Sequence, residues 1–294
     1  MSDFIGTKLT MNLGERSYDI IVKRGSLENL YQFARLDRRV AVVTDSGVPA
    51  QYAQRVADQC KDATIITVPQ GEASKSFKIL ETVLRQMLDF GMGRGDLVVA
   101  VGGGVVGDLA GFAASIYMRG IDFINCPTTT LSMIDSSIGG KTAVDLGDTK
   151  NIVGAFWQPK LVIVDPDTLS TLPRRHFING LAEAVKAGLL ADPELFSIFE
   201  KEDVDDRIGD IICRSLRFKK SIVEQDETEQ GMRKALNFGH TIGHGIEAVK
   251  GIKGRRTTGL FHGECVALGM LPMIESKALQ KRVRGVYRRL GLPT

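Results

Sequence analysis

Histidines are few in this chain of 294 residues, and three of the four lie between positions 240 and 262. On a helix, His240 and His244 are one turn apart on the same face, so their imidazoles can bind one ion together or divide ligand and proton-transfer roles. His262 would approach from a neighbouring segment. A metal site is therefore our first hypothesis. The alternative is that two of these histidines are buried and hydrogen-bonded to the main chain, while the third lies at the surface.

A carboxylate and an ammonium group interrupt an otherwise apolar segment, the predicted helix over residues 177–190. Glu183 and Lys186 are three residues apart on this helix, and such a pair usually forms a surface ion pair. Almost no polar face is left here, because the neighbours are Leu181, Ala182, Ala184, Val185, Ala187, Gly188, Leu189 and Leu190. We therefore expect Glu183 to be buried or bound to a metal ion.

A glycine-rich loop follows an apolar strand in the first half of the chain. The strand Leu97–Val101 runs into Gly102, Gly104 and Gly107, and a helical pattern follows. This order fits the G-x-G-x-x-G motif, in which backbone N–H groups approach a pyrophosphate at a helix N-terminus. The alternative is a tight structural turn. Because no acidic residue stands at the usual distance downstream, we predict a dinucleotide site of non-standard layout.

Further polar groups follow this loop. Thr128 and Thr129 end a strand, and Asp135–Thr142 places an acid, a glycine pair and Lys141 in one turn region. The segment is similar to the end of a P-loop, but position 135 lacks the first glycine of that motif, so a Walker A site is not predicted. Lys150–Asn151 is expected just before the strand of the next unit.

The elements that must position these groups alternate between strands and helices up to residue 172. Residues 8–13 and 18–23 predict a hairpin on either side of a turn. Strands are then predicted at 40–44, 64–68, 97–101, 123–126 and 161–164, with helices such as 49–59 and 76–90 between them. Repeated strand–helix units predict an α/β, Rossmann-like domain with a mostly parallel sheet over residues 1–172.

The pattern becomes almost wholly helical after Pro173. Apolar residues recur with helical spacing over 177–190, 193–200, 207–225, 234–249 and 263–281. We therefore predict an all-α C-terminal domain over residues 173–294.

Composition excludes several classes of protein. The chain is 43% hydrophobic and 25% charged, and its 38 basic and 35 acidic residues give a net charge of +3, so neither nucleic acid nor an anionic membrane is expected as a partner. The four cysteines are far apart, which suits reduced thiols. The N-terminus lacks the apolar core of a signal peptide, and the longest apolar run is too short to span a bilayer. We predict a cytoplasmic protein of a size typical of enzymes.

Taken together, these residues resemble the 3-dehydroquinate synthase family of sugar-phosphate cyclases. The matching stretches keep their order over nearly the whole chain, and they are Gly71–Glu72, Gly102–Asp108, Arg119–Gly120, Pro127–Thr129, Asp135–Thr142, Lys150–Asn151, Gly180–Glu183, Lys219, Arg233, Asn237–His244 and His262–Glu264.

The resemblance implies a lyase of the shikimate pathway that binds NAD in the N-terminal domain and a divalent zinc or cobalt ion in the helical domain. Its small-molecule substrate would be the sugar phosphate 3-deoxy-D-arabino-heptulosonate 7-phosphate. The implied products are 3-dehydroquinate and phosphate, formed by transient oxidation, phosphate elimination, re-reduction and intramolecular aldol closure. Members of this family usually form homodimers.

The resemblance also implies residue roles. Glu183, His240 and His262 match the metal ligands, a carboxylate with two imidazoles that leaves open positions for substrate hydroxyl groups. His244 and Glu229 match proton-transfer groups. Substrate-contacting positions are matched by Lys141, Asn151, Lys186, Lys219, Arg233, Asn237, Arg119 and Asp135. The NAD-contacting positions are matched by Asp45, Glu72, Lys75, Gly104, Val105, Val106, Gly107, Asp108, Thr128, Thr129, Lys150, Thr168, Leu169, Ser170 and Thr171.

Three features depart from the family pattern. The sequence ends at Thr294, whereas family members continue and contribute another active-site lysine, so we expect the sequence to be truncated. The segment around residues 251–258 is longer than usual and is expected to affect delivery of His262. Gln70 stands where many relatives have an acid.

Three other interpretations remain open. Related sugar-phosphate cyclases differ at the positions that match Lys219, Arg233 and His244, and metal-dependent polyol dehydrogenases lack the cluster of cations. The third is an inactive binding or scaffold protein.

Overall fold

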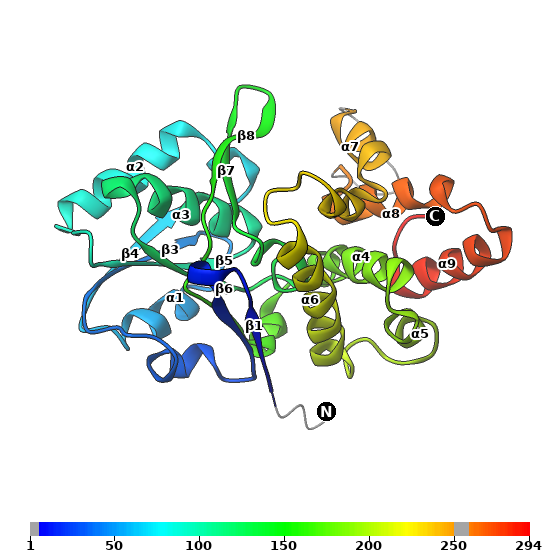
Figure 1. Ribbon diagram of the computed structural model, residues 1–294, viewed down its shortest axis with the longest axis horizontal. Coiled ribbons are helices and arrows are strands. Elements are labelled where there is room, and N and C mark those ends of the chain that lie inside the picture. The colour runs from blue at the N-terminus through cyan, green and yellow to red at the C-terminus, as the bar shows by residue number, and fades with distance from the viewer. Residues whose placement is uncertain (1–5, 250–258) are drawn as a thin grey trace. The chain divides into compact units, whose positions relative to one another are not determined.

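The computed structural model describes residues 6–249 and 259–294 (Figure 1). The chain divides into two compact units, an N-terminal unit that ends at Leu172 and a helical unit that runs from Pro173 to Thr294. The lengthened segment around residues 251–258 lies outside the described residues.

The N-terminal unit is built on a seven-stranded sheet with the strand order β1-β2-β9-β6-β5-β3-β4. Only the pairing of β1 with β2 is antiparallel, which confirms the predicted hairpin and the mostly parallel sheet. The strands are β1 (Thr7–Met11), β2 (Tyr18–Val22), β3 (Arg39–Asp45), β4 (Asp62–Val68), β5 (Leu97–Gly102), β6 (Asp122–Pro127) and β9 (Leu161–Val164).

Helices cover both faces of this sheet, as Figure 1 shows. On one face, α2 (Phe77–Asp89) and α3 (Gly104–Ile116) pack against Ala41 and Val43 of β3. On the other face, α1 (Ala50–Ala57) and the 3-10 helix Leu27–Gln32 pack against Val40 and Val42 of the same strand. Successive side chains of a strand point to opposite faces, so a segment buried on both sides is apolar, as Val40–Val43 of β3 and Leu97–Val101 of β5 are.

The strand order reverses beside β3. The chain passes from β3 to its edge neighbour β4, and then returns to the other side of β3 with β5. In open α/β sheets, ligands bind beyond the carboxyl ends of the strands at such a reversal. The residues that follow β3 and β5 are therefore placed where a ligand is expected.

A second, two-stranded sheet consists of β7 (Lys141–Leu146) and β8 (Thr149–Phe156). It corrects the predictions for this segment: Lys141 is the first residue of a strand, and Lys150 and Asn151 lie inside β8 instead of before the next strand. The strands are joined by a turn in which Gly147 has a φ of +59°. The Gly147–Asp148 pair in this turn is typical of a β-hairpin.

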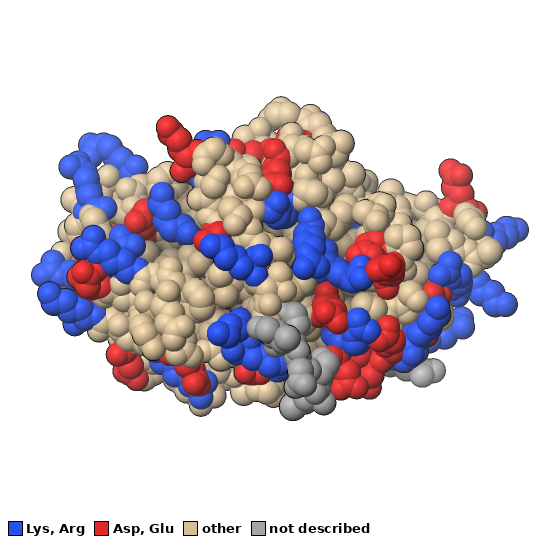
Figure 2. Space-filling model, turned by 60° about the horizontal axis from the view of Figure 1, so that its bottom comes forward, with Lys and Arg blue, Asp and Glu red and all other residues tan. Residues whose placement is uncertain are grey.

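The described residues of the helical unit form helices and turns only, which confirms the predicted fold class. The helices are α4 (Arg174–Leu190), α5 (Pro193–Lys201), α6 (Ile208–Gln225), α7 (His240–Ala248), α8 (His262–Met270) and α9 (Lys277–Leu290). A search of the described residues finds no helix that is both long enough and apolar enough to cross a bilayer. Acidic and basic side chains are interspersed on the face of the molecule shown in Figure 2.

Two predicted helices, 234–249 and 263–281, are each broken. The first contains a 3-10 turn, Met232–Asn237, and α7 begins only after Gly239, which has a φ of +80°. The second ends at Met270 because Pro272 lies in the short turn that follows, and α9 begins after Ser276, whose hydroxyl accepts a hydrogen bond from the Leu279 N–H. Helical spacing alone did not reveal these interruptions.

Candidate functional site

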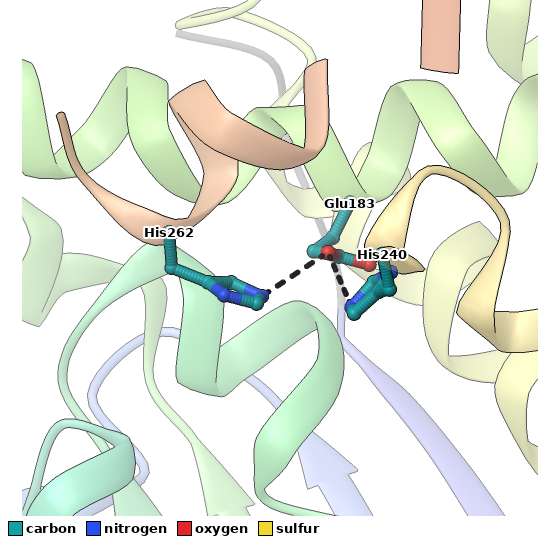
Figure 3. A group of neighbouring side chains, drawn as sticks. All are labelled: Glu183, His240 and His262. Atoms are coloured by element: carbon teal, nitrogen blue, oxygen red, sulfur yellow. Dashed lines mark ion pairs between the residues drawn. The ribbon is translucent and has the colours of Figure 1, made fainter. Parts of the chain in front are cut away.

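Three side chains from three helices converge in the helical unit (Figure 3). Glu183 comes from α4, and His240 and His262 are the first residues of α7 and α8. The Nε2 atoms of His240 and His262 are each 3.7 Å from Oε1 of Glu183. One ligand atom of each residue lies within 4.8 Å of the others, a spacing at which all three can bind one metal ion.

The carboxylate of Glu183 is the most unusual group of this cluster. Its side chain is 2% exposed, and neither carboxylate oxygen accepts a hydrogen bond. The ammonium of Lys186, one turn further along α4, is within ion-pair distance of it. Burial raises the pKa of Glu183, but the charges of Lys186 and the two imidazoles outweigh burial and hold the pKa far below its usual range. A buried, ionised carboxylate beside two imidazoles fits a divalent cation.

The two imidazoles differ in their surroundings. Burial lowers the pKa of His240, which favours the neutral form that binds metals. For His262, burial is outweighed by the carboxylates of Glu183 and Glu247, and the pKa rises to about 9. Nδ1 of His262 is 3.6 Å from Oε2 of Glu247 on α7, so a carboxylate stands behind the ring. Such a partner orients a metal-binding imidazole.

Glycines let α7 and α8 approach closely and so bring His240 near His262. A Cβ atom on Gly269 would lie 2.1 Å from the carbonyl oxygen of Gly239, and one on Gly243 would lie 3.1 Å from that of Cys265. Both contacts are closer than side chains allow without a shift. The glycines among the histidines therefore serve helix packing.

His244 is exposed and lies one turn beyond His240 on α7. Its ring centroid is 5.3 Å from that of His240 and 5.9 Å from that of His262. With Glu247 and His262 it forms a second group whose ligand atoms lie within 4.8 Å of one another. The first group is better suited to an ion, because only there is a fully buried carboxylate without a hydrogen bond.

Three predicted substrate cations of the helical unit are buried: Lys186, Lys219 on α6 and Arg233 are 4%, 8% and 2% exposed. Nζ of Lys186 donates to the Leu236 carbonyl oxygen at 2.6 Å, and Arg233 donates to a main-chain carbonyl oxygen in the loop that precedes it. Cations are rarely buried unless they are paired. This unit therefore buries three cations, and one of them, Lys186, pairs with Glu183 of the converging side chains.

Glu229 and Asn237 are joined by a hydrogen bond of 3.2 Å from Asn237 Nδ2 to Glu229 Oε1. Glu229 has a φ of +61°, in the loop after α6. Asp226 holds this loop by accepting the N–H groups of Gln230, Gly231 and Arg233. The sequence analysis missed Asp226, although an aspartate just after a helix and followed by turn residues is a known loop signal.

The glycine loop of the N-terminal unit has the predicted order of strand, turn and helix. Gly102 ends β5 and Gly104 begins α3. A Cβ atom on Gly102 would lie 2.6 Å from the Val106 side chain, and one on Gly107 would lie 3.0 Å from Asn125 Nδ2. These glycines therefore let α3 pack closely on the sheet, with its N-terminal N–H groups at the carboxyl end of β5.

Other predicted nucleotide-site residues also lie at strand ends. Asp45 ends β3, and its carboxylate accepts the N–H groups of Gly47 and Val48 at 2.7 and 3.2 Å. Thr128 and Thr129 follow β6, and the Thr128 N–H donates to the Gly102 carbonyl oxygen at 2.9 Å. Since β3, β5 and β6 are neighbours in the sheet, these residues are brought together.

Lys75 joins three of the predicted positions. Its side chain is 4% exposed, and Nζ is 2.6 Å from Oδ2 of Asp108 on α3. It also donates to Oδ1 of Asn151 on β8, where the neighbouring Lys150 is exposed, and Nζ is 3.9 Å from Oε1 of Glu72. This cluster therefore links α3 with the β7–β8 hairpin.

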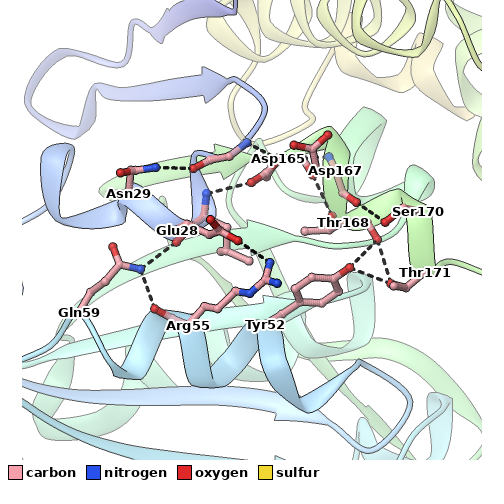
Figure 4. Close-up of polar contacts among 12 residues, drawn as sticks. Glu28, Asn29, Tyr52, Arg55, Gln59, Asp165, Asp167, Thr168, Ser170 and Thr171 are labelled. Carbon is pink, nitrogen blue, oxygen red and sulfur yellow. Dashed lines mark hydrogen bonds and ion pairs between the residues drawn. The ribbon is translucent and has the colours of Figure 1, made fainter. Parts of the chain in front are cut away.

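The segment Thr168–Thr171 lies in the 3-10 helix after β9 (Figure 4). The hydroxyl groups of Tyr52 and Thr171 are 2.9 Å apart, and the Thr171 hydroxyl donates to the Thr168 carbonyl oxygen at 3.1 Å. Asp165 is the N-cap residue of this 3-10 helix, and its carboxylate accepts the N–H groups of Gly25, Leu27 and Asp167. Burial raises the pKa of Asp165. Tyr52 and Asp165 were missed by the sequence analysis.

Arg119, Asp135 and Lys141 lie in separate elements of the N-terminal unit. Arg119 has a φ of +71° and precedes Gly120, where a Cβ atom would lie 2.5 Å from the Trp157 ring. Asp135 lies in a π-helical turn, Ser132–Ser136. Lys141 begins a strand, whereas a P-loop lysine lies at a helix N-terminus, so the structure also argues against a Walker A site.

Two solved structures share this fold closely. One is a 2-deoxy-scyllo-inosose synthase complexed with carbaglucose-6-phosphate, NAD⁺ and Co²⁺, with a TM-score of 0.84 and 25% identity over 98% of this chain and 84% of that one. The other is a 2-epi-5-epi-valiolone synthase from Streptomyces hygroscopicus subsp. jinggangensis with NAD⁺ and Zn²⁺ bound, with a TM-score of 0.84 and 30% identity over 96% and 82%. The fold is thus that of a class of synthases crystallised with a dinucleotide and a divalent metal ion.

Sequence comparison narrows the class. Residues 65–179 match the sequence model for the 3-dehydroquinate synthase N-terminal region, and residues 180–289 match that for its C-terminal region. The 3-dehydroquinate synthases of Pelobacter propionicus and Thermodesulfovibrio yellowstonii are 44% and 40% identical, each over 97% of this chain and 84% of the relative. The chain belongs to the 3-dehydroquinate synthase family.

Proposed function

We propose that this protein is a 3-dehydroquinate synthase, a lyase that converts 3-deoxy-D-arabino-heptulosonate 7-phosphate to 3-dehydroquinate and phosphate. The observation that carries this proposal is the identity of 40–44% with 3-dehydroquinate synthases over nearly the whole chain. The cofactors would be NAD and a zinc or cobalt ion, as in the two synthase structures.

Glu183, His240 and His262 would hold the divalent ion, and the hydrogen-bond deficit of the buried Glu183 carboxylate supports this assignment. When bound, the nucleotide supplies a reversible hydride acceptor and the ion supplies a positive charge that polarises substrate hydroxyl groups. Glu247 would keep Nε2 of His262 directed toward Glu183 by its contact with Nδ1.

The family resemblance assigns substrate contacts to charged and polar side chains. In the helical unit, Lys186, Lys219 and Arg233 would bind the phosphate and carboxylate of the substrate, because a buried cation gains most from an anionic partner. Asn237 would add a neutral donor. In the N-terminal unit, the corresponding residues are Arg119, Asp135, Lys141 and Asn151.

Proton transfer is assigned to His244 and Glu229. His244 is exposed, one turn beyond a ligand on α7, so its imidazole is near the ion without being needed to bind it. The carboxylate of Glu229 accepts a hydrogen bond from Asn237, which orients it beside a substrate-binding group. Imidazole and carboxylate side chains are common general acids and bases in enzymes.

The nucleotide would lie at the carboxyl ends of β3, β5 and β6. Its pyrophosphate would face the N-terminal N–H groups of α3, over residues 104–108, as the closely packed glycines of that helix permit. Asp45, Glu72, Lys75, Thr128, Thr129 and Lys150 would contact other parts of it, as would the segment 168–171. We further propose that the protein acts in the cytoplasm and, as the family resemblance implies, as a homodimer.

Phosphate release tests the assignment. Protein stripped with a chelator, then supplied with NAD⁺ and Zn²⁺ or Co²⁺, should release phosphate from the heptulosonate phosphate and form 3-dehydroquinate. Omission of the metal ion should abolish release, and a hexose phosphate should serve as a poor substrate. Release that favours the hexose phosphate would instead support a related sugar-phosphate cyclase, and no release from metal-loaded protein would contradict both.

A further inference from the structure

We propose that Arg175 and Asn179 of α4 are positioning residues that fix the main chain of His262 opposite Glu183. The inference rests on the metal centre of the proposed function. It concerns how this chain positions the third proposed ligand, His262, which lies far from Glu183 in the sequence.

The two residues share one face of α4 with Glu183. Arg175, Asn179 and Glu183 are each four residues apart, so they stack along one side of the helix, and we call them the α4 stripe. All of α4 from Asn179 to Gly188 is buried, which holds the stripe in a single position. One helix therefore carries both a proposed ligand and the residues that contact the start of α8.

Arg175 forms the first contact. Its Nε and Nη2 atoms donate to the two carboxylate oxygens of Glu264 at 3.0 and 2.8 Å, and its guanidinium carbon lies 3.8 Å from the centre of the Phe261 ring. Glu264 is 2% exposed, and its Oε2 also accepts the Phe261 N–H at 2.9 Å. One arginine therefore contacts both Phe261, which precedes His262, and Glu264, which follows it. Its contact with the Glu264 carboxylate is bidentate.

Asn179 forms the second contact. Its side-chain oxygen accepts the N–H of Gly263 at 2.7 Å. A Cβ atom on Gly263 would lie 2.0 Å from the Asn179 carbonyl oxygen, so only glycine permits this approach. His262 stands between Phe261 and Gly263, and both of these neighbours have their N–H groups fixed. Its Cα position is therefore set by the α4 stripe before any ion binds, which is the condition for a preorganised ligand.

Asn179→Ala is the direct test, and Asn179→Asp is its matched control because aspartate keeps an oxygen acceptor for the Gly263 N–H. Zinc affinity of the stripped protein is measured by competition with a chromophoric chelator, together with the visible absorption spectrum of the Co²⁺ form. Asn179→Ala should weaken zinc binding about 10- to 100-fold and alter the cobalt spectrum, the range found for partners of metal ligands. Asn179→Asp should bind like the wild type.

Two further variants keep the test decisive. Arg175→Lys retains the charge but loses the two-pronged contact with Glu264, and it should also weaken zinc binding. Arg174→Ala, at the adjacent position, removes an exposed ion pair with Asp205 and a cation–π contact with Phe177, neither of which involves α8, and should leave both readouts unchanged. The melting temperature of the metal-free protein is recorded for all variants.

The outcomes separate the inference from the function beneath it. Wild-type zinc affinity and cobalt spectrum in both Asn179→Ala and Arg175→Lys would overturn the positioning role. A loss of affinity in Arg174→Ala equal to theirs would overturn it as well, because the effect would then be general damage to α4. A wild-type protein that binds no zinc would instead contradict the metal centre of the proposed function.

Discussion

The candidate sites of the two units differ in how their polar groups are satisfied. In the N-terminal unit, Asp45 accepts two main-chain N–H groups, and Lys75 is bonded to Asp108 and Asn151. In the helical unit, both carboxylate oxygens of Glu183 are buried without a hydrogen bond. Asp45 and Lys75 thus have protein partners, whereas the buried Glu183 carboxylate belongs to a charge arrangement that an ion would complete.

This difference follows from the elements that build each site. Strand ends and a helix N-terminus offer main-chain groups whose positions are set by the sheet, so side chains there need few additional partners. Three helices offer only side chains, and their packing has to bring distant residues together. The helical site is therefore the more sensitive of the two to single substitutions.

Replacement of His262 by alanine should have the largest effect. It removes one of three proposed ligands, so zinc affinity should fall by more than about 100-fold and phosphate release should be lost. This loss exceeds the usual effect of replacing a residue that hydrogen-bonds to a metal ligand. Metal content after dialysis and NAD⁺ binding are measured together. NAD⁺ binding should persist, and its loss would show that the two sites are not separable.

His244→Ala should slow turnover by about 10²–10⁴-fold, the usual contribution of a positioned acid or base. The variant should keep its metal ion, since His244 is not a proposed ligand. Steady-state kinetics and metal analysis distinguish the two roles. Equal metal loss in the His244 and His262 variants would favour the second group, with Glu247, as the ion site.

Glu247→Gln should lower zinc affinity about 10- to 100-fold, because the carboxylate behind His262 is replaced by a neutral amide. A matched control is Glu200→Gln, which removes a carboxylate that pairs with Arg282 between α5 and α9. The same chelator competition applies to both. Similar affinity losses in the two variants would exclude a specific role for Glu247.

Lys75→Met should weaken NAD⁺ binding roughly tenfold and leave zinc affinity unchanged. The substitution removes the partner of Asp108, and a hydrogen bond to a charged group contributes about 1.5–3 kcal/mol, reduced here because Asp108 is partly exposed. Fluorescence titration with NAD⁺ provides the measurement. An unchanged affinity would mean that Lys75 supports the fold alone.

Much of the fold was predictable because its signals are local. The apolar runs of β3 and β5, the glycine loop after β5 and the helical spacing after Pro173 each depend on a few consecutive residues. The β7–β8 hairpin escaped prediction because its strands follow several glycines and polar residues that resemble a loop. The breaks before α7 and after α8 depend on single residues, Gly239 and Pro272.

The members of the three-helix cluster, Glu183, His240 and His262, were predictable, but its geometry was not. Histidine spacing and the apolar surroundings of Glu183 pointed to the three residues, with the family resemblance deciding between alternatives. The contact of Arg175 with Glu264 joins residues far apart in the chain, and no periodic pattern reveals it. Tyr52 and Asp165 were missed for the same reason, because each has main-chain or hydroxyl partners that only the folded chain brings near. Asp226 differs, because its partners Gln230, Gly231 and Arg233 follow it closely in the sequence.

The close packing of α7 on α8 through Gly239, Gly243 and Gly269 bears on how this family can change in length. Direct contact between the two helices sets the separation of His240 and His262. This separation therefore does not depend on the number of residues between Val249 and Gly259. As a general rule, doubling the length of a loop costs only about 0.6 kcal/mol in closure entropy. Insertions between the two histidines are therefore tolerable in evolution, whereas an added methyl group at Gly269 is not.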